Sequence, residues 1–190
     1  MLKQLIILAL LVSVPANCMS FGEGYMVKGF QPLLNASEEE KLAFYSAVDS
    51  FKLYSSFFGE LYYLNDYLIS QHGDTPEIIL EYLSNGFNED LAQDIIAAYT
   101  TWNPQLQKQI IIPCDGLPIL TEDHFAEAEY FHPEKDFIIF KVILYDCYDP
   151  GDAYEFLVAS EKTGDNWRIK SLRFDPLPRQ GYEEDGSIGI

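Results

Sequence analysis

Three runs of aromatic and β-branched residues fill the stretch from Asp136 to Phe174, and two turn sequences separate them. The turns are Asp-Pro-Gly-Asp at 149–152 and Lys-Thr-Gly-Asp at 162–165. Aromatic and β-branched residues favour strands, whereas Pro, Gly and Asp favour tight reversals between them. The stretch therefore predicts an antiparallel meander whose strands span 136–148, the region around 154–158, and 167–174.

In the first part of the chain, before this meander, the apolar residues recur at helical spacing. Ser37 and Glu40 form a capping-box pattern that opens a helix, and Gly59 kinks or ends it. One face of this helix carries an apolar, mostly aromatic stripe that consists of Phe44, Val48, Phe51, Tyr54 and Phe58. Such a stripe is typical of a helix packed against a core.

Further helical segments are expected before the chain changes to strands. They lie at 60–71, after Pro76, and from Asn88 to the Trp-Asn-Pro sequence at 102–104. Strands are then expected at 108–113 and at 125–131, with an irregular edge or turn at 114–120. Helices followed by an antiparallel meander predict an α+β fold, with N-terminal helices packed on a curved antiparallel sheet.

The N-terminus has the order of a secretory signal. Lys3 precedes an apolar run from Leu5 to Val14, and small residues lead to a cleavage position after Ala16. We therefore expect a signal peptide at 1–16, a flexible arm at 17–36, one domain at 37–174, and a mobile acidic tail at 175–190.

This signal predicts a secreted or periplasmic protein. Cys18 leaves a lipid anchor as a less favoured alternative, because Pro15 and Asn17 match a lipidation signal poorly. Membrane attachment is expected only if Cys18 is lipidated. Export also favours a disulfide bond between Cys114 and Cys147.

The formal net charge of −18 is the most unusual feature of the composition. Binding to nucleic acid or anionic lipid depends on Lys and Arg, so neither partner is expected. A cationic protein fits this charge better, although solubility and self-repulsion explain it equally well.

The final hairpin resembles that of nuclear-transport-factor-2-like proteins, the cone fold related to cystatins. Gly164, Trp167, Arg168 and Ile169 match a Gly turn followed by the Trp-Arg-Ile pattern of that family, and residues 111–125 resemble its exported bacterial members. The resemblance covers about residues 37–174. It implies a pocket between the helices and the sheet, where some members catalyse reactions and others only bind ligands. The aromatic residues that would face a ligand there are Phe51, Tyr54, Phe58, Phe140 and Phe156.

Two groups of residues could carry chemistry. His124 and Asp123 are the pair best suited to acid–base catalysis in such a pocket. Asp146, Asp149, Asp152 and Glu155 surround the Pro-Gly turn and could bind Ca²⁺, although their spacing does not match an EF-hand and turn formation alone explains them. No sequence motif indicates a cofactor.

We therefore expect a non-catalytic, exported binding module. Its partner would be a cationic protein or a small apolar ligand, and small exported inhibitors of cell-wall endopeptidases are similar in size and in the order of their elements. The expected partner-binding residues are Glu127, Glu129, Asp149 and Asp152. The alternative is an enzyme of the same fold that uses His124 and Asp123.

Overall fold

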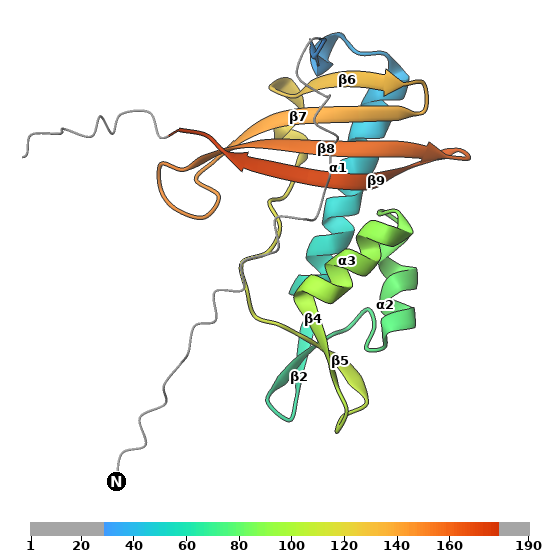
Figure 1. Cartoon of the computed structure of the whole chain (residues 1–190), viewed down its shortest axis with the longest axis vertical. Coiled ribbons are helices and arrows are strands. Elements are labelled where there is room, and N and C mark those ends of the chain that lie inside the picture. Colours follow the sequence, from blue (N-terminus) through green and yellow to red (C-terminus); the bar gives the residue numbers. More distant parts are fainter. Residues whose placement is uncertain (1–28, 179–190) are drawn as a thin grey trace, which may run out of the picture.

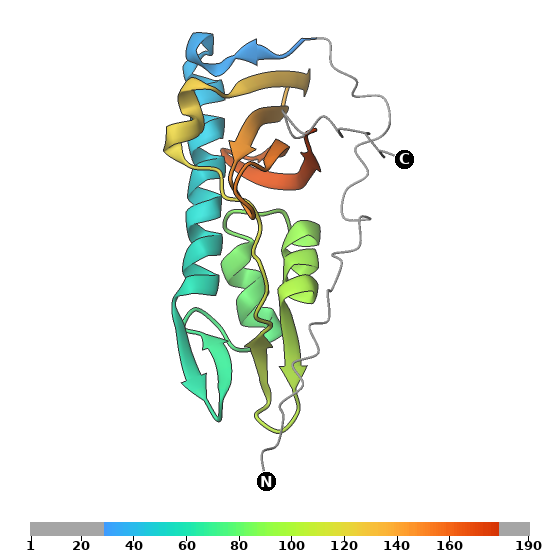
Figure 2. The same cartoon turned by 90° about the vertical axis from the view of Figure 1, so that its left-hand side faces the viewer.

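A computed structural model describes residues 29–178 and shows an α+β fold (Figure 1). The long helix α1 (Glu38–Gly59) packs on one face of a five-stranded antiparallel sheet. Figure 2 shows that α1 continues past the sheet into a second group of elements, which contains two short helices and two small hairpins. The predicted signal peptide, Cys18, most of the arm and most of the tail lie outside the described residues.

The predicted meander is confirmed. It consists of β7 (Phe137–Tyr145), β8 (Ala153–Thr163) and β9 (Asn166–Pro176). Two further strands, β6 (Glu129–Glu134) and β1 (Gln31–Pro32), complete the sheet in the order β1-β6-β7-β8-β9.

A bulge in β9 sets which of its residues face the helix. Ala159 pairs with Ser171 and Ser160 pairs with Ile169, so Lys170 is an extra residue on that strand. Because the bulge shifts the alternation of side chains, Ile169 and Leu172 are both buried although they are three residues apart.

The predicted start and end of α1 are also confirmed. The Glu40 carboxylate accepts hydrogen bonds from the Ser37 hydroxyl and, at 2.6 Å, from the Ser37 backbone N–H, which is the capping box. The helix ends at Gly59, and the Glu60 N–H still donates to the Ser56 carbonyl. The stripe of α1 enters the core, where Phe44 and Phe51 are fully buried.

The helix predicted at 60–71 is wrong. This segment forms a hairpin of β2 (Leu61–Leu64) and β3 (Tyr67–Ser70). Asn65 and Asp66 have φ values of 50° and 67°, and a two-residue turn with left-handed backbone matches the twist of the flanking strands. The leucines in this segment are spaced as in a helix, which led to the wrong prediction. The turn residues Asn65 and Asp66 and the tyrosines favour a hairpin instead.

The next two helices begin as predicted. Helix α2 (Pro76–Leu83) is capped by Thr75, and α3 (Glu89–Tyr99) is capped by Asn88, whose side chain accepts from the Leu91 N–H at 3.0 Å. The expected end of α3 at 102–104 is wrong, because residues Thr100–Asn103 form strand β4 and pair with β5 (Lys108–Ile111).

The predicted strand at 125–131 begins later than expected. A short 3-10 helix, η2 (Glu122–Ala126), occupies its first part, and β6 starts only at Glu129. A further 3-10 turn, η1 (Leu33–Asn35), places Leu33 in the core near the N-terminal end of α1.

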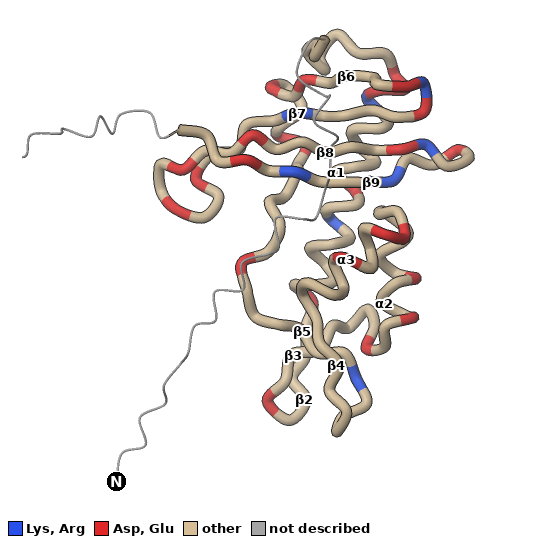
Figure 3. The backbone as a smooth tube through the Cα atoms, viewed as in Figure 1, with Lys and Arg blue, Asp and Glu red and all other residues tan. Residues whose placement is uncertain are grey.

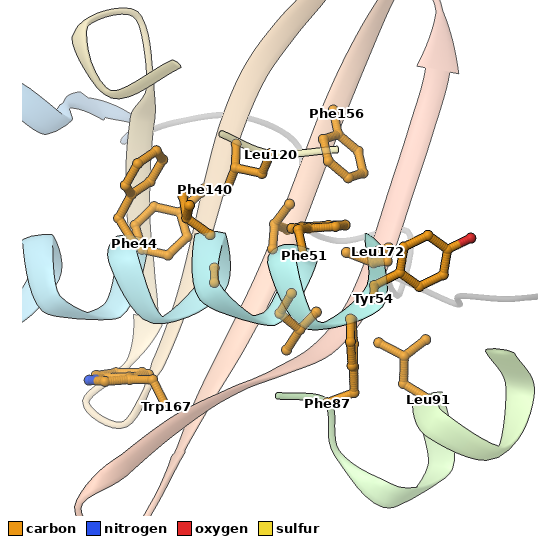
Figure 4. Packing of buried hydrophobic residues seen from close by; sticks show 14 of the residues in the cluster. Phe44, Phe51, Tyr54, Phe87, Leu91, Leu120, Phe140, Phe156, Trp167 and Leu172 are labelled. Carbon is orange, nitrogen blue, oxygen red and sulfur yellow. The ribbon is translucent and has the colours of Figure 1, made fainter. Parts of the chain in front are cut away.

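The core lies between α1 and the sheet and extends toward α2 and α3 (Figure 4). Phe44 packs edge-on against Phe140 at 5.5 Å between ring centroids, and Phe51 lies 5.7 Å from Phe156. These contacts hold the middle of α1 over β7 and β8, so the helix and the sheet form one packed unit.

The capping box predicts how stability depends on pH. Burial raises the pKa of the Glu40 carboxyl, but the hydrogen bonds from Ser37 and His132 together outweigh it and hold this pKa below its ordinary value. A lowered pKa in the folded state stabilises the protein above the unfolded pKa of about 4.3, and this contribution is lost as the pH falls through the folded pKa.

Glu40→Gln keeps a hydrogen-bond acceptor but removes the charge, so it should cost about 0.3–1 kcal/mol of unfolding free energy at neutral pH, the usual contribution of a carboxylate near a helix N-terminus, and less in acid. Urea denaturation of both proteins at a series of pH values measures this difference. A difference that stays constant or grows as the pH falls would contradict the assignment.

Candidate functional site

The five aromatic residues expected to face a ligand are packed against one another and their neighbours. Phe51, Phe140 and Phe156 are fully buried, Tyr54 is nearly so, and Phe58 lies partly buried at 4.6 Å from the Tyr54 ring. The Tyr54 hydroxyl accepts a hydrogen bond from the Leu117 N–H at 3.1 Å. The structure thus gives these side chains a packing role: Phe51, Phe140 and Phe156 pack between α1 and the sheet. Tyr54 and Phe58 pack against Tyr99 of α3.

The predicted disulfide bond between Cys114 and Cys147 is wrong. Both residues are exposed and carry free thiols. Cys114 lies in the extended segment after β5, and Cys147 lies in the β7–β8 loop (residues 146–152). A hydrogen bond of 3.2 Å from the Tyr148 hydroxyl to the Gly116 carbonyl connects these two segments instead.

Asp152 organises the β7–β8 loop. Its carboxylate accepts hydrogen bonds from the backbone N–H groups of Cys147, Tyr148 and Asp149 at 2.9 to 3.1 Å. Asp152 is only 7% exposed, so the prediction that it lies open to a partner is wrong. A carboxylate that accepts three backbone hydrogen bonds holds a loop without needing a metal ion.

The other carboxylates proposed as Ca²⁺ ligands do not converge with Asp152. The Asp146 side chain accepts from the Gly151 N–H at 2.6 Å, Asp149 is exposed, and Glu155 lies on β8. Among residues 29–178, no group of three or more His, Cys, Asp or Glu side chains is arranged to hold a metal ion.

His124 has a local role in the 3-10 helix η2. Its Nδ1 accepts a hydrogen bond from the Thr121 N–H at 3.0 Å and lies 3.0 Å from the Thr121 hydroxyl. Asp123 is exposed beside it, and His124 is half-buried. The pair proposed for acid–base catalysis thus includes a histidine whose Nδ1 caps a helix.

Of the two acidic residues predicted on a strand, only one reaches it. Glu127 is exposed in the turn before β6, whereas Glu129 begins β6 and forms an ion pair with Lys141 on β7. The ion pair reduces the charge that Glu129 offers to a partner. Glu127 and Asp149 are the predicted partner-binding residues that remain exposed.

The structure also brings three aromatic side chains together at the end of the sheet where the β7–β8 loop lies. Tyr148 of the β7–β8 loop lies 5.6 Å from Tyr154 and 6.4 Å from Phe174, and the latter two rings are 6.0 Å apart. Tyr148 is 40% exposed and Phe174 is 36% exposed. Tyr154 lies two residues before the buried Phe156 on β8, and Phe174 pairs with Phe156, so both lie on the face of the sheet that bears the core.

Carboxylates surround this cluster. Burial, together with the nearby Tyr99, Cys147, Tyr154 and Asp115, raises the pKa of Tyr148 to about 12. Burial also raises the pKa of Tyr154, with Asp152 and Asp149 contributing. Both phenols therefore remain protonated at neutral pH, and their hydroxyls already make hydrogen bonds, Tyr148 to the Gly116 carbonyl and Tyr154 to Asp152. We call Tyr148, Tyr154, Phe174, Asp115 and Asp149 the aromatic–acidic patch.

Basic residues are scarce at this patch. Figure 3 shows acidic residues and no basic residue along the β7–β8 loop. Within the described part of the chain, neither Asp115 nor Asp149 forms an ion pair, whereas Lys41, Lys52, Lys108, Lys141, Lys162, Lys170 and Arg173 all do. The charge of these two carboxylates is thus available to a partner.

Sequence reasoning identified Asp149 but missed the aromatic part of the patch. The available signal was the sequence Tyr145-Asp-Cys-Tyr148-Asp149, in which aromatic residues alternate with acids in a loop. Phe174 joins the patch through the pairing of β8 with β9. Asp115 joins it because the segment after β5 contacts the β7–β8 loop.

Searches against protein-family models, curated proteins and solved structures give no match for this chain. In the region from 29 to 178, no helix is both long and apolar enough to cross a membrane.

Proposed function

We propose that this chain is a non-catalytic binding module that recognises a cationic protein through the aromatic–acidic patch. The observation that carries the proposal is a cluster of three aromatic rings, of which Tyr148 and Phe174 are exposed, beside two carboxylates that have no ion-pair partner in the described residues. The N-terminal sequence supports export, so a basic extracytoplasmic enzyme, such as one that acts on the cell wall, is the class of partner that we favour. The resemblance to the NTF2-like family remains a prediction.

Aromatic rings and carboxylates together suit a Lys or Arg side chain. A cation over an aromatic face gains electrostatic energy from the ring, and nearby carboxylates add a direct ion pair. Exposed aromatic residues are also common at the centres of protein interfaces, where burial removes them from water. The net charge of −18 would in addition speed the approach of a basic partner.

The packing of the core supports recognition at the surface over the binding of an apolar ligand inside. The aromatic residues between α1 and the sheet contact one another, and Phe51, Phe140 and Phe156 are fully buried. The enzymatic alternative lacks a supporting contact, since His124 Nδ1 bonds to Thr121.

Selection of random twelve-residue peptides on the immobilised protein tests this proposal, because the protein itself selects the side chains that it binds. We expect the selected peptides to be enriched in Lys and Arg, and Tyr148→Ala to weaken their binding about tenfold, an effect of ordinary size for an aromatic residue at an interface centre. Alanine at His124 and Asp123 should leave binding unchanged. The proposal would be contradicted if the selected peptides lacked basic residues, or if they bound the Tyr148→Ala variant as tightly as the wild type.

A further inference from the structure

A second candidate site lies away from the five-stranded sheet, where the two small hairpins meet (Figure 2). A pocket of about 300 Å³ opens between β3 of one hairpin and the β4–β5 hairpin. We call it the hairpin groove, and it is lined by Tyr67, Trp102, Asn103, Pro104, Gln105 and Ile110. None of these side chains is charged. Aromatic and amide groups therefore determine what the groove can bind.

The two aromatic side chains of the groove are not used in packing against other rings. Tyr67 is 40% exposed and Trp102 is 47% exposed. In the described part of the chain, neither ring contacts another ring or a cation, and the Tyr67 hydroxyl and the Trp102 N–H have no hydrogen-bond partner. By contrast, the equally exposed Tyr45 stacks on Phe125 at 5.6 Å between ring centroids. The groove thus offers a ligand accessible ring surface and two unused polar groups.

Asn103 adds a largely buried hydrogen-bond donor to the groove. It is only 8% exposed, and its Oδ1 accepts hydrogen bonds from the Gln105 and Leu106 N–H groups at 3.0 and 3.1 Å. Its Nδ2 group has no partner among residues 29–178, yet it is not sealed from solvent. Because the turn fixes Oδ1, the amide orientation is set, and Nδ2 is available to an acceptor in the groove.

The scarcity of charge restricts the class of ligand. The two hairpins carry one acidic residue, Asp66, and one basic residue, Lys108, whose ammonium group pairs with Asp74 (Figure 3). The net charge of −18 repels an anionic ligand, and a cationic ligand finds no carboxylate in the groove. The groove therefore suits an uncharged ligand that has an apolar face for the rings and polar edges for the amides.

We propose that the hairpin groove binds a neutral carbohydrate. A pyranose ring presents C–H groups on its faces and hydroxyls at its edges, so one face lies on Tyr67 or Trp102 while hydroxyls bond to Asn103 Nδ2 and the Gln105 amide. A sugar hydroxyl both donates and accepts, which matches the mixed character of Gln105 and Tyr67. Proline residues, which also dock in aromatic grooves, offer acceptors only. This inference concerns a different surface from the aromatic–acidic patch and does not depend on the function proposed for that patch.

Two measurements test the proposal together. The labelled protein is first applied to an array of neutral glycans that includes cellohexaose, chitohexaose and maltohexaose, with hexagalacturonate as the acidic control and hexaproline as the peptide control. Nuclear magnetic resonance of the ¹⁵N-labelled tryptophan side chains then locates the most strongly retained probe. The chain has two tryptophans, so Trp102→Phe removes one indole signal and assigns it, and the buried Trp167 is the internal reference.

We expect neutral glycans to be retained and the strongest of them to shift the Trp102 signal in a saturable way, with little change at Trp167. Tyr67→Ala should weaken binding about fivefold to tenfold through loss of a ring contact. Gln105→Ala should weaken it about threefold through loss of a hydrogen bond. Tyr145→Ala is the matched control, because it removes a tyrosine that is 67% exposed on β7, and it should bind as the wild type does.

Retention of no neutral glycan, a shift of Trp102 with hexaproline alone, or equal binding by Tyr67→Ala and the wild type would each overturn the proposal. Sedimentation of the free protein checks a further occupant: a dimer that Tyr67→Ala abolishes would show that a second copy fills the groove instead. None of these variants alters a residue of the aromatic–acidic patch, so the peptide-binding test of that patch is unaffected by any of these outcomes.

Discussion

Phe51→Ala is expected to lower the free energy of unfolding by about 3–5 kcal/mol, the usual range for removing a buried phenylalanine ring. Phe51 is fully buried and its ring contacts Phe156 on β8 and Phe87 before α3, at centroid distances of 5.7 and 6.3 Å. It therefore joins α1, the sheet and the α2–α3 region. Chemical denaturation of the purified protein measures the loss.

Leu42→Ala is the matched control for this prediction, because Leu42 is on the same helix but 57% exposed. A substitution at such a position typically changes stability by less than about 0.5 kcal/mol. Similar losses for the two variants would show that Phe51 does not occupy the centre of the core.

Gly86→Ala is expected to destabilise the fold by about 1–3 kcal/mol or more through overpacking. A Cβ atom at Gly86 would lie 2.8 Å from both the Cβ and the Oγ of Ser50 and 2.9 Å from its Cα. The Gly86 carbonyl also accepts a hydrogen bond from the Ser50 hydroxyl at 2.9 Å, so the turn after α2 is held close to α1. Thermal or chemical unfolding of the variant tests this contact.

Gly59→Ala provides the corresponding control, since no atom lies within 4 Å of the position its Cβ would take. We expect it to be neutral. Ser50→Gly itself loses the hydrogen bond to Gly86 and places a glycine inside α1, so it is the reference for the double variant. In that background Gly86→Ala should cost less than in the wild type, because only the Ser50 Cα remains too close. Full stability of Gly86→Ala alone would mean that the turn and α1 are farther apart than in this structure.

The parts of the fold that could be predicted from sequence have strong local signals. The capping box of Ser37 and Glu40, the caps of α2 and α3, and the two turns of the final meander each depend on residues a few positions apart. Such signals determine the backbone locally, whatever the rest of the chain does. The α+β architecture followed from their order.

The wrong assignments occur where local patterns compete. Residues 60–71 have leucines at helical spacing, but Asn65 and Asp66 adopt left-handed backbone conformations and make a hairpin. At 125–131, the alternation of apolar and acidic residues suggested a strand, whereas Thr121 and His124 cap a 3-10 helix that uses the first of these residues. In both places the turn chemistry overrides the pattern of hydrophobic residues.

The candidate site was only partly accessible to sequence reasoning for a related reason. The exposure and charge of Asp149 could be inferred from its Pro-Gly turn. The same reasoning predicted wrongly that Asp152 is exposed, whereas its carboxylate accepts hydrogen bonds from three backbone N–H groups. The meeting of Tyr148, Tyr154 and Phe174 depends on strand register and on how the β7–β8 loop folds back. No local pattern determines these contacts.

Cationic partners could be recognised by the aromatic–acidic patch, as we propose, or attracted by the overall negative charge. Two charge-matched variants separate these explanations. Asp115→Asn/Asp149→Asn removes two charges at the patch, and Glu77→Gln/Glu81→Gln removes two exposed charges on α2.

The decisive measurement is the affinity of both variants for the most strongly selected basic peptide, by isothermal titration calorimetry at the same ionic strength. If the patch recognises the peptide, the patch variant should bind about tenfold more weakly than the wild type, while the α2 variant should stay within about twofold of it. Equal weakening in both variants would show that net charge alone attracts the peptide, and the proposed site would then be wrong.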